Sequence, residues 1–558
     1  MGDLLVGLLI APLSASVVAL FGKLVPAKRL TIVVASLSIP ANGVLLALLL
    51  PTIREGSVLT YAMGGWPAPL GIEIQLNGLG WIASALIVVI SVAVILVSTA
   101  RHGDDPAYFF FLFLLIAGMQ AVVVTTDLFN MFVSFEIVAI AAYVLIAYEK
   151  STTSLVASVK YLILSTVGIL FFLVGVLLVY RDIGSLAFGD VSRAIAEDPT
   201  VGESGSMHLA IAALCVGIGV RTAFIPFHTW LPEAHAYAPH PISAMLSGVL
   251  IKVSFLAMVR VLAAFRADYL NELLLWIGAV TAFVAVIWAL SQSDAKRLLA
   301  YHSISQMGYI LAAFGIGGFS GELAAVSHAV NHALFKSLLF VTVGTAVDLG
   351  GSRNLYKLGG LGRRAPLLAV TFLVGALSIA GMPPFNGYAS KQLVSAALSG
   401  RAAYVLIWIT GVGTVASFIK LSRIFSFRRD GVDGGENAES MRSPSGRSKG
   451  SPVSTGFAVV FLASLCVFTG VFPELVGGFL GSILHHRAAT PALPTFFSSG
   501  KLLQTALVLG LGVGTFFAAT SKPAGLVTGR IKTLAPDIET VLVFFFAGLT
   551  LFALVSYL

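Results

Sequence analysis

The chain has 558 residues and a formal net charge of +8, but only 11% of its residues are charged and 57% are hydrophobic. A soluble domain has about 25% charged residues, so the composition excludes an ordinary soluble protein. Apolar runs of roughly 20 residues, the length that crosses a hydrocarbon core, recur along the chain without strand-period alternation. The basic residues lie in short loops and not on a polar domain, so the positive charge indicates membrane orientation and not nucleic-acid binding.

Taken in chain order, the apolar runs predict membrane spans at residues 3–22, 29–50, 76–99, 107–125, 127–147, 159–180, 208–231, 241–263, 272–291, 299–318, 322–346, 366–400, 402–426 and 455–478, with weaker spans at 502–520 and 538–557. The sequence therefore predicts an all-α polytopic membrane protein with about 14–16 transmembrane helices. The first run has no basic segment before it and no evident cleavage site, so we interpret it as a transmembrane helix and not as a removed signal.

The order of the spans predicts five regions along the chain. They are residues 1–106 with the first three helices, 107–263 and 272–426 with five helices each, a flexible cytoplasmic loop at 427–454, and the C-terminal helices at 455–558. Gly, Ser and charged residues dominate the 427–454 loop, as in flexible connectors. Basic residues gather in loops that follow odd-numbered helices, so the positive-inside rule places the N-terminus outside and this loop inside the cell.

The two five-helix units are predicted to be repeats of one fold. The fourth helix of each is interrupted by proline, at Pro226 in helix 7 and at Pro383 and Pro384 in helix 12. Because each unit has an odd number of helices, the second must enter the membrane inverted relative to the first, as in many transporters. Proline kinks are also common in ordinary membrane helices, which is the alternative explanation of the two breaks.

Five charged residues lie where a membrane helix should be apolar: Glu136, Arg221, Lys252, Lys336 and Lys391. Each would cost about 2.5–3.5 kcal/mol at the centre of a bilayer, so they must face one another, water or a polar interior. Burial favours the neutral form of a lysine, which can then exchange a proton near neutral pH. The pattern therefore predicts a proton relay, with a partner for Lys252 on another helix. In the alternative, Glu136 only forms a static ion pair that locks two helices together.

His328, His332 and Lys336 are spaced by four residues, so they lie on one face of a single helix. Histidine titrates near pH 6.5, so this face can carry protons through bound water. Two other interpretations are that the histidines bind zinc or that they hydrogen-bond neighbouring helices. No His-Glu-x-x-His pattern is present and the lysine would repel a cation, so we expect no metal. Three further histidines, His228, His235 and His240, follow the first break and either extend the relay or belong to a loop.

The sequence indicates no cofactor and no catalytic centre. Its two cysteines, Cys215 and Cys466, both lie in apolar runs, and it contains no Cys-x-x-Cys pair, haem attachment site or iron–sulfur spacing. It also contains no nucleotide-binding loop. We therefore expect no covalent catalysis within this chain, whether or not the complex that contains it is driven by a redox reaction.

Four strings resemble those of the antiporter-like subunit family. They are DLFNMFVSFE at 127–136, FHTWLPEAH at 227–235, DAKRLLAYHSISQMGY at 294–309 and GMPPFNGYASK at 381–391. The family includes the D subunit of Mrp-type sodium/proton antiporters, the large proton-pumping subunits of complex I and their relatives in membrane-bound hydrogenases. The resemblance covers roughly residues 60–426, and the string GGWPAPLG at 64–71 is more similar to the Mrp and hydrogenase members.

The resemblance implies roles for individual residues. Glu136 matches the family's fifth-helix glutamate, Lys252 its eighth-helix lysine and Lys391 its twelfth-helix lysine, which in the family form a chain of protonatable groups across the membrane. One position departs from the pattern, because the family's seventh-helix lysine is Arg221 here. Arginine does not give up its proton in proteins. Arg221 can therefore pair with Glu136 or tune it, but should not itself shuttle protons.

We therefore expect an ion-translocating, multi-pass subunit of the inner (plasma) membrane that moves protons, exchanges them for sodium in an antiporter, and has other membrane subunits and lipid as partners. Whether the complex is an antiporter or a redox enzyme of the NADH-quinone oxidoreductase or hydrogenase type stays open. A rival from another class is a structural anchor whose charge network only fixes helix packing. A self-sufficient carrier for an organic solute is disfavoured, because no enlarged polar pocket is evident from the sequence.

Overall fold

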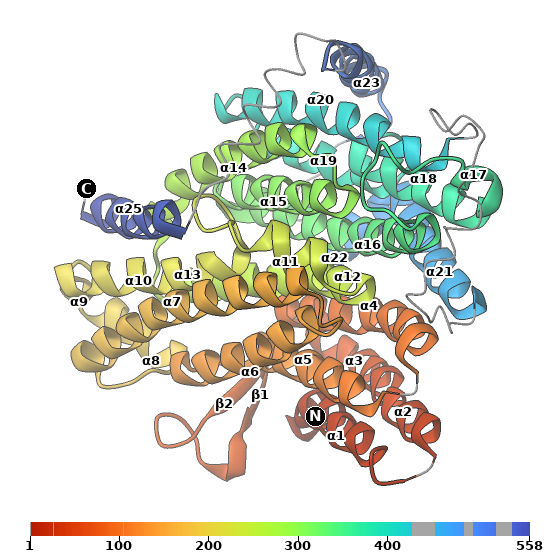
Figure 1. Ribbon diagram of the computed structural model, residues 1–558. Coiled ribbons are helices and arrows are strands. Elements are labelled where there is room, and N and C mark those ends of the chain that lie inside the picture. The colour runs from red at the N-terminus through yellow and green to blue at the C-terminus, as the bar shows by residue number, and fades with distance from the viewer. Residues whose placement is uncertain are drawn as a thin grey trace.

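The computed structural model describes residues 2–25, 27–103, 105–426, 452–484, 495–519 and 538–557. Its long helices run roughly side by side in one bundle (Figure 1). Within the described residues, 13 helices are long and apolar enough to cross a membrane, which confirms the predicted all-α polytopic fold. Residues 427–451 of the expected flexible loop lie outside the described residues, and residues 452–454 begin a helix.

The N-terminal region contains α1 (Gly2–Phe21), α2 (Lys28–Ser36), α3 (Ser38–Arg54) and α4 (Gly78–His102). Between α3 and α4, the strands β1 (Leu59–Ala62) and β2 (Glu73–Leu76) pair antiparallel, with Leu59 opposite Leu76. The hairpin lies at the edge of the bundle near α6 (Figure 1).

The first predicted unit contains α5 (Pro106–Val124), α6 (Leu128–Ile146), α7 (Thr152–Ile183), α10 (Gly205–Thr222), α11 (Leu231–Tyr237), α12 (His240–Met245) and α13 (Ile251–Ala264). The short helices α8 (Phe188–Glu197) and α9 (Pro199–Gly202) connect α7 to α10. A π-helical turn at Leu246–Leu250 joins α12 to α13. The start of α6 is fixed by Asp127, whose carboxylate accepts a hydrogen bond from the Asn130 backbone N–H at 2.7 Å.

The second predicted unit contains α14 (Asn271–Ser291), α15 (Ala295–Phe314), α16 (Gly318–Gly350), the short α17 (Leu361–Arg364), α18 (Pro366–Ala380), α19 (Asn386–Ala397) and α20 (Ala403–Ser422). The chain continues with α21 (Pro452–Val471), α22 (Pro473–Leu484), α23 (Ser499–Ala519) and α25 (Ile538–Tyr557). Three short 3₁₀ turns complete the description, η1 (Met63–Gly65), η3 (Asp268–Leu270) and η4 (Arg423–Phe425).

Both predicted helix breaks are present. Residues 223–230 separate α10 from α11, and residues 381–385 separate α18 from α19. The residue that follows each first half adopts a left-handed backbone, with φ at 60° for Ala223 and 81° for Gly381, which ends the helix before the proline is reached. That the two units are inverted relative to one another stays a prediction.

Small residues let the central helices approach closely. In lipid no hydrophobic force drives helices together, so packing must be tight. A Cβ atom on Gly278 would lie 2.3 Å from the Ala312 backbone nitrogen, and one on Gly308 would lie 2.4 Å from that of Ala282. Glycine at both positions therefore holds α14 against α15, and α15 also packs against α16. α16 is in turn packed against α12, α18 and α19, and its predicted histidines, His328 and His332, are fully buried.

Candidate functional site

Glu136 and Arg221 form an ion pair between α6 and the last turn of α10. The Arg221 Nη2 atom donates to Glu136 Oε1 at 3.1 Å. Arg221 is 2% exposed, whereas Glu136 is 38% exposed. The guanidinium also lies 4.8 Å from the centroid of the Phe135 ring, and its Nε and Nη1 atoms have no hydrogen-bond partner among the described residues. The pairing expected for Arg221 is therefore present. The arginine is buried, whereas the glutamate is partly exposed.

A cluster of buried titratable side chains lies where α16 passes α11, α13 and α15. Its members are Lys252, Lys336, His332, His302 and His235, and each is at most 1% exposed. The charge of Lys336 acts electrostatically on the other four. We call these five residues the central cluster. It unites three predicted residues, Lys252, His332 and Lys336, with two histidines from other helices.

Lys252 has a different partner from the one that we expected. Its ammonium donates to the Ser247 carbonyl in the adjoining π-helical turn, where the wider turn takes carbonyl groups out of the regular α-helical ladder. The expectation of a partner on another helix is wrong for the described contacts, because Ser247 belongs to the turn before the same helix and the lysine of another helix that interacts with Lys252, Lys336, has the same sign. With no carboxylate within 4 Å of either lysine in the described part of the chain, charging both at once is electrostatically unfavourable.

Several nitrogen atoms of the central cluster lack a hydrogen-bond partner from the protein. Among the described residues, no partner is found for either ring nitrogen of His235, His302 or His332, or for the Lys336 ammonium. Buried polar groups in native proteins almost always have a partner, and water supplies one where the surroundings are polar. The cluster is therefore suited to bound water and to proton exchange through it.

His328 connects the central cluster to α19. Its Nδ1 atom lies 3.0 Å from Ser390 Oγ, and its Nε2 atom lies 3.1 Å from Gln306 Oε1. Its ring is nearly parallel to that of His332, with centroids 6.3 Å apart, as the spacing of four residues predicts. The contacts of His328 are those of a histidine that hydrogen-bonds neighbouring helices, one of the interpretations left open by the sequence.

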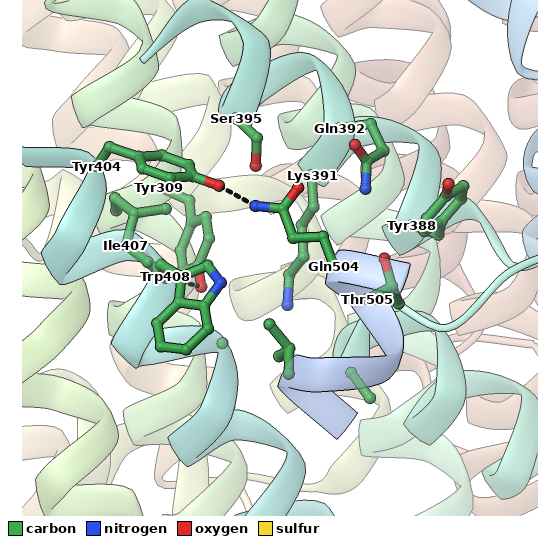
Figure 2. Close-up of a pocket in the computed structure, with 14 residues that line it drawn as sticks. Tyr309, Tyr388, Lys391, Gln392, Ser395, Tyr404, Ile407, Trp408, Gln504 and Thr505 are labelled. Carbon is green, nitrogen blue, oxygen red and sulfur yellow. Dashed lines mark hydrogen bonds between the residues drawn. The ribbon is translucent and has the colours of Figure 1, made fainter. Parts of the chain in front are cut away.

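Lys391 lies just beyond the second break and beside a cavity. Its ammonium donates to the Ile379 carbonyl in the last turn of α18 at 2.6 Å and lies 5.3 Å from the centroid of the Tyr309 ring. The cavity offers about 70 Å³ to water molecules, and one water needs roughly 10–15 Å³, so several fit. Figure 2 shows the Lys391 side chain entering this space among Tyr309, Tyr404 and Gln504.

The Glu136–Arg221 pair and the central cluster are separated by aromatic rings. Tyr161 and Trp230 lie 4.7 Å apart between ring centroids, and Trp230 and His235 lie 5.9 Å apart. The charge of Arg221 acts on Tyr161. The structure therefore brings five of the predicted residues into two groups, Glu136 with Arg221 and Lys252 with His332 and Lys336, whereas His328 and Lys391 lie outside both. The aromatic rings lead from the first group to His235 of the central cluster.

Beyond His235, the central cluster adjoins a network of polar side chains that extends to the surface. The charge of Lys296 acts on both His235 and His240, and the Lys296 ammonium donates to the Ala238 carbonyl at 2.5 Å. The Arg101 guanidinium lies 3.2 Å from His240 Nδ1 and donates to Asp348 and to Glu149. These two carboxylates are 43% and 36% exposed. His228 stands apart from this network and stacks on Trp288, with centroids 5.0 Å apart.

Sequence reasoning missed His302, Gln306 and Ser390. All three are polar residues within strings that resemble the family, but nothing in their spacing shows which way they face. His302 and Gln306 are four residues apart on α15, and both approach α16 only because glycine holds α15 in the middle of the bundle. The spacing of four shows that His302 and Gln306 share one face of α15, which is the signal that could have marked these two, whereas Ser390 of α19 gave no such signal.

The fold and the buried charges define a class: a polytopic membrane protein with a polar, titratable interior. The transmembrane model of the NADH:quinone oxidoreductase/Mrp antiporter family matches residues 125–419, more than half of the chain. The N subunit of the NADH-quinone oxidoreductase of Desulforudis audaxviator is 31% identical over 413 residues, which cover 72% of this chain and 81% of the relative. The chain therefore belongs to the NADH:quinone oxidoreductase/Mrp antiporter family.

Two further similarities are to a subunit of an antiporter and to a chain of a respiratory membrane complex. The D subunit of the Na(+)/H(+) antiporter of Bacillus subtilis is 28% identical over 395 residues, which cover 69% of this chain and 79% of the relative. A chain of the membrane-bound sulfane sulfur reductase, an archaeal respiratory membrane complex, superposes with a TM-score of 0.74 at 25% identity and covers 91% of this chain and 99% of its own length. Antiporter and redox branches are thus both represented among the relatives.

Proposed function

We propose that the chain is the ion-translocating subunit of a multisubunit complex in the inner (plasma) membrane and that it moves protons through the central cluster. In an antiporter the protons exchange for sodium, and in a respiratory or hydrogenase complex a redox reaction drives them. The observation that carries the proposal is a group of buried nitrogens that have no hydrogen-bond partner among the described residues. The group extends over three helices, from His235 through His302 to Lys336.

In this proposal, groups that interact electrostatically mark a route through the chain. Toward one surface, Lys252 is followed by His235, Lys296 and His240, and the route ends at the exposed carboxylates of Asp348 and Glu149. In the other direction, the route passes through Lys336, His332 and His328 and ends at Lys391 and its cavity. In this proposal water connects the groups, since a lysine or histidine can pass a proton only to a hydrogen-bonded neighbour.

Glu136 and Arg221 act in the proposal as an electrostatic control and not as proton carriers in series. Arg221 keeps its charge and is held by a single carboxylate contact and an aromatic ring. A proton that binds Glu136 would release this buried charge from its partner, and the released field would act on the neighbouring Tyr161. The coupling between the two groups then depends on charge and not on continuous proton transfer.

The proposal is tested with Lys391→Ala in the intact complex, reconstituted into vesicles that contain a pH-sensitive dye. We expect insertion and assembly to persist while proton transport is lost. Lys420→Ala is the matched control, because the Lys420 ammonium also donates to helix-end carbonyls, those of Leu290 at 2.9 Å and Gln292 at 2.5 Å, but is not part of the route. Unchanged transport in Lys391→Ala would refute the assignment.

One observation favours the structural-anchor alternative. Lys252 and Lys391 both donate to carbonyl groups at irregular helix turns, and a purely structural cation would do the same. Under this alternative, the Lys252→Met, Lys391→Met double mutant loses stability but retains normal coupling in whatever complex assembles. Loss of coupling in a complex that still assembles would exclude the anchor.

A further inference from the structure

The Lys391 cavity has a wall that comes from outside the region matched by the family. The family model ends at residue 419, whereas Gln504, Thr505 and Val508 of α23 line the cavity opposite Lys391 and Ser395 of α19. Because these three residues belong to the lining, displacement of α23 would widen the cavity on that side. Access to Lys391 therefore depends on where α23 lies.

Among the described residues, one side-chain hydrogen bond joins α23 to α20 beside the cavity. The Gln504 side-chain amide donates to the Tyr404 hydroxyl, and Figure 2 shows these two side chains pointing toward one another beside Lys391. Tyr404 lies three residues after the exposed Arg401, which forms an ion pair with Glu272 at 3.3 Å. The contact therefore lies in the first turn of α20, close in sequence to this exposed ion pair.

α23 packs along α20 but is otherwise little enclosed by the described part of the chain. Gly512 is its one buried residue among those described, and a Cβ there would lie 2.4 Å from the Val415 Cβ of α20. Leu503 on the outer face is 64% exposed. Because lipid competes equally well for apolar surface, the helix is held by this close approach and by the Gln504–Tyr404 bond. Both can be removed by substitution.

We propose that α23 is a movable wall of the Lys391 cavity, with the Gln504–Tyr404 hydrogen bond as its latch. When the bond is formed, α23 covers one side of the cavity, which stays partly open. When it breaks, more water reaches Lys391 from the side of α23. The latch matters for transport only if Lys391 exchanges protons, so its role rests on the proposed function, but its effect on access to the cavity does not.

The test measures access directly, with Ser395→Cys as a reporter that lines the cavity. The two native cysteines are buried. The intact complex is treated with a membrane-impermeant methanethiosulfonate, and the labelling rate is compared between the reporter alone and the reporter combined with Gln504→Ala or Tyr404→Phe. We expect labelling about tenfold faster in both, the factor that corresponds to the loss of one hydrogen bond of about 1.4 kcal/mol. Leu503→Ala is the matched control on α23 and should leave the rate unchanged.

A second variant covers the case in which a latch variant fails to assemble. Gly512→Leu cannot fit against Val415 and should displace α23 without altering either latch residue, so that labelling again accelerates. Equal labelling rates in the reporter, the latch variants and Gly512→Leu would overturn the proposal. Faster labelling together with normal proton transport in Lys391→Ala would instead support the latch and refute the proposed function, so the two failures are distinguishable.

Discussion

Replacement of Lys336 by methionine separates a transport role from a structural one more sharply than any other single change. Lys336 is completely buried on α16, and in the described part of the chain its ammonium has no hydrogen-bond partner. Its favourable contact is with the Phe340 ring, 5.7 Å from the ammonium to the centroid. Methionine has a similar length and fills irregular space well, so the substitution removes the amine with little change in packing.

The expected effect on stability is a gain. An ammonium in the centre of a membrane costs about 2.5–3.5 kcal/mol, and the aromatic contact returns about 1 kcal/mol. Lys336→Met should therefore stabilise the assembled complex by roughly 2 kcal/mol. Proton transport should fall at least about 100-fold, because a positioned proton carrier typically contributes about 10²–10⁴-fold.

Two measurements on the same purified complex check this prediction. Thermal or chemical unfolding in detergent gives the change in stability, and dye-monitored acidification of vesicles gives transport. Leu338→Met, which replaces a fully buried neighbour on the same helix, is the matched control and should change neither by much. A loss of stability would show that Lys336 has a structural partner, and full transport would show that the central cluster does not need it; either result refutes the reasoning.

Three other predictions concern residues outside the central cluster and the makeup of the complex. Arg221→Lys should keep or raise proton transport, because lysine preserves the charge beside Glu136 and adds a group that releases a proton; a complete loss, measured in vesicles, would show that the guanidinium itself is needed. Arg260→Met should destabilise the complex by about 2–3 kcal/mol, because Arg260 donates to the Val123 and Thr125 carbonyls at the end of α5 at 2.5 Å each; transport per assembled complex should not change, and a selective loss of transport would contradict this. Mass spectrometry of the native complex should find either iron–sulfur or dehydrogenase subunits, which would mean a redox-driven pump, or small membrane subunits alone, which would mean an antiporter; a chain that purifies without partners would contradict both.

The helices and their breaks could be predicted because membrane insertion imposes a simple rule on length and apolarity. The run that contains His328, His332 and Lys336 shows this well: the spacing of four predicts one face, and the rings of the two histidines are indeed nearly parallel. The pairing of Arg221 with Glu136 was also within reach, because a buried arginine requires an opposite charge. The first prediction depends only on the geometry of a single helix. The second depends only on the need of a buried charge for an opposite charge beside it.

What the sequence could not show is which faces of different helices meet. Lys252 was expected to find a partner on another helix, but a π-helical turn supplies the Ser247 carbonyl instead, and such a turn has no clear signature in sequence. His302 was not singled out because its role depends on the packing of α15 against α16. The Lys391 cavity needs residues from α19, α20 and α23 together, and no local pattern connects Lys391 with Gln504.

The two helix breaks are closed by different chemistry. In the first, the Trp230 indole donates to the Val220 carbonyl of α10 at 2.7 Å; in the second, the Lys391 ammonium donates to the Ile379 carbonyl of α18. An indole N–H is the same at every pH, whereas an amine that loses its proton no longer neutralises the negative end of a helix dipole. The hydrogen bond at the first break is consequently independent of pH, whereas the one at the second break depends on the charge of Lys391. Each proton that leaves Lys391 would therefore loosen the last turn of α18. Hydrogen exchange at the backbone amides of residues 379–382 would record this effect.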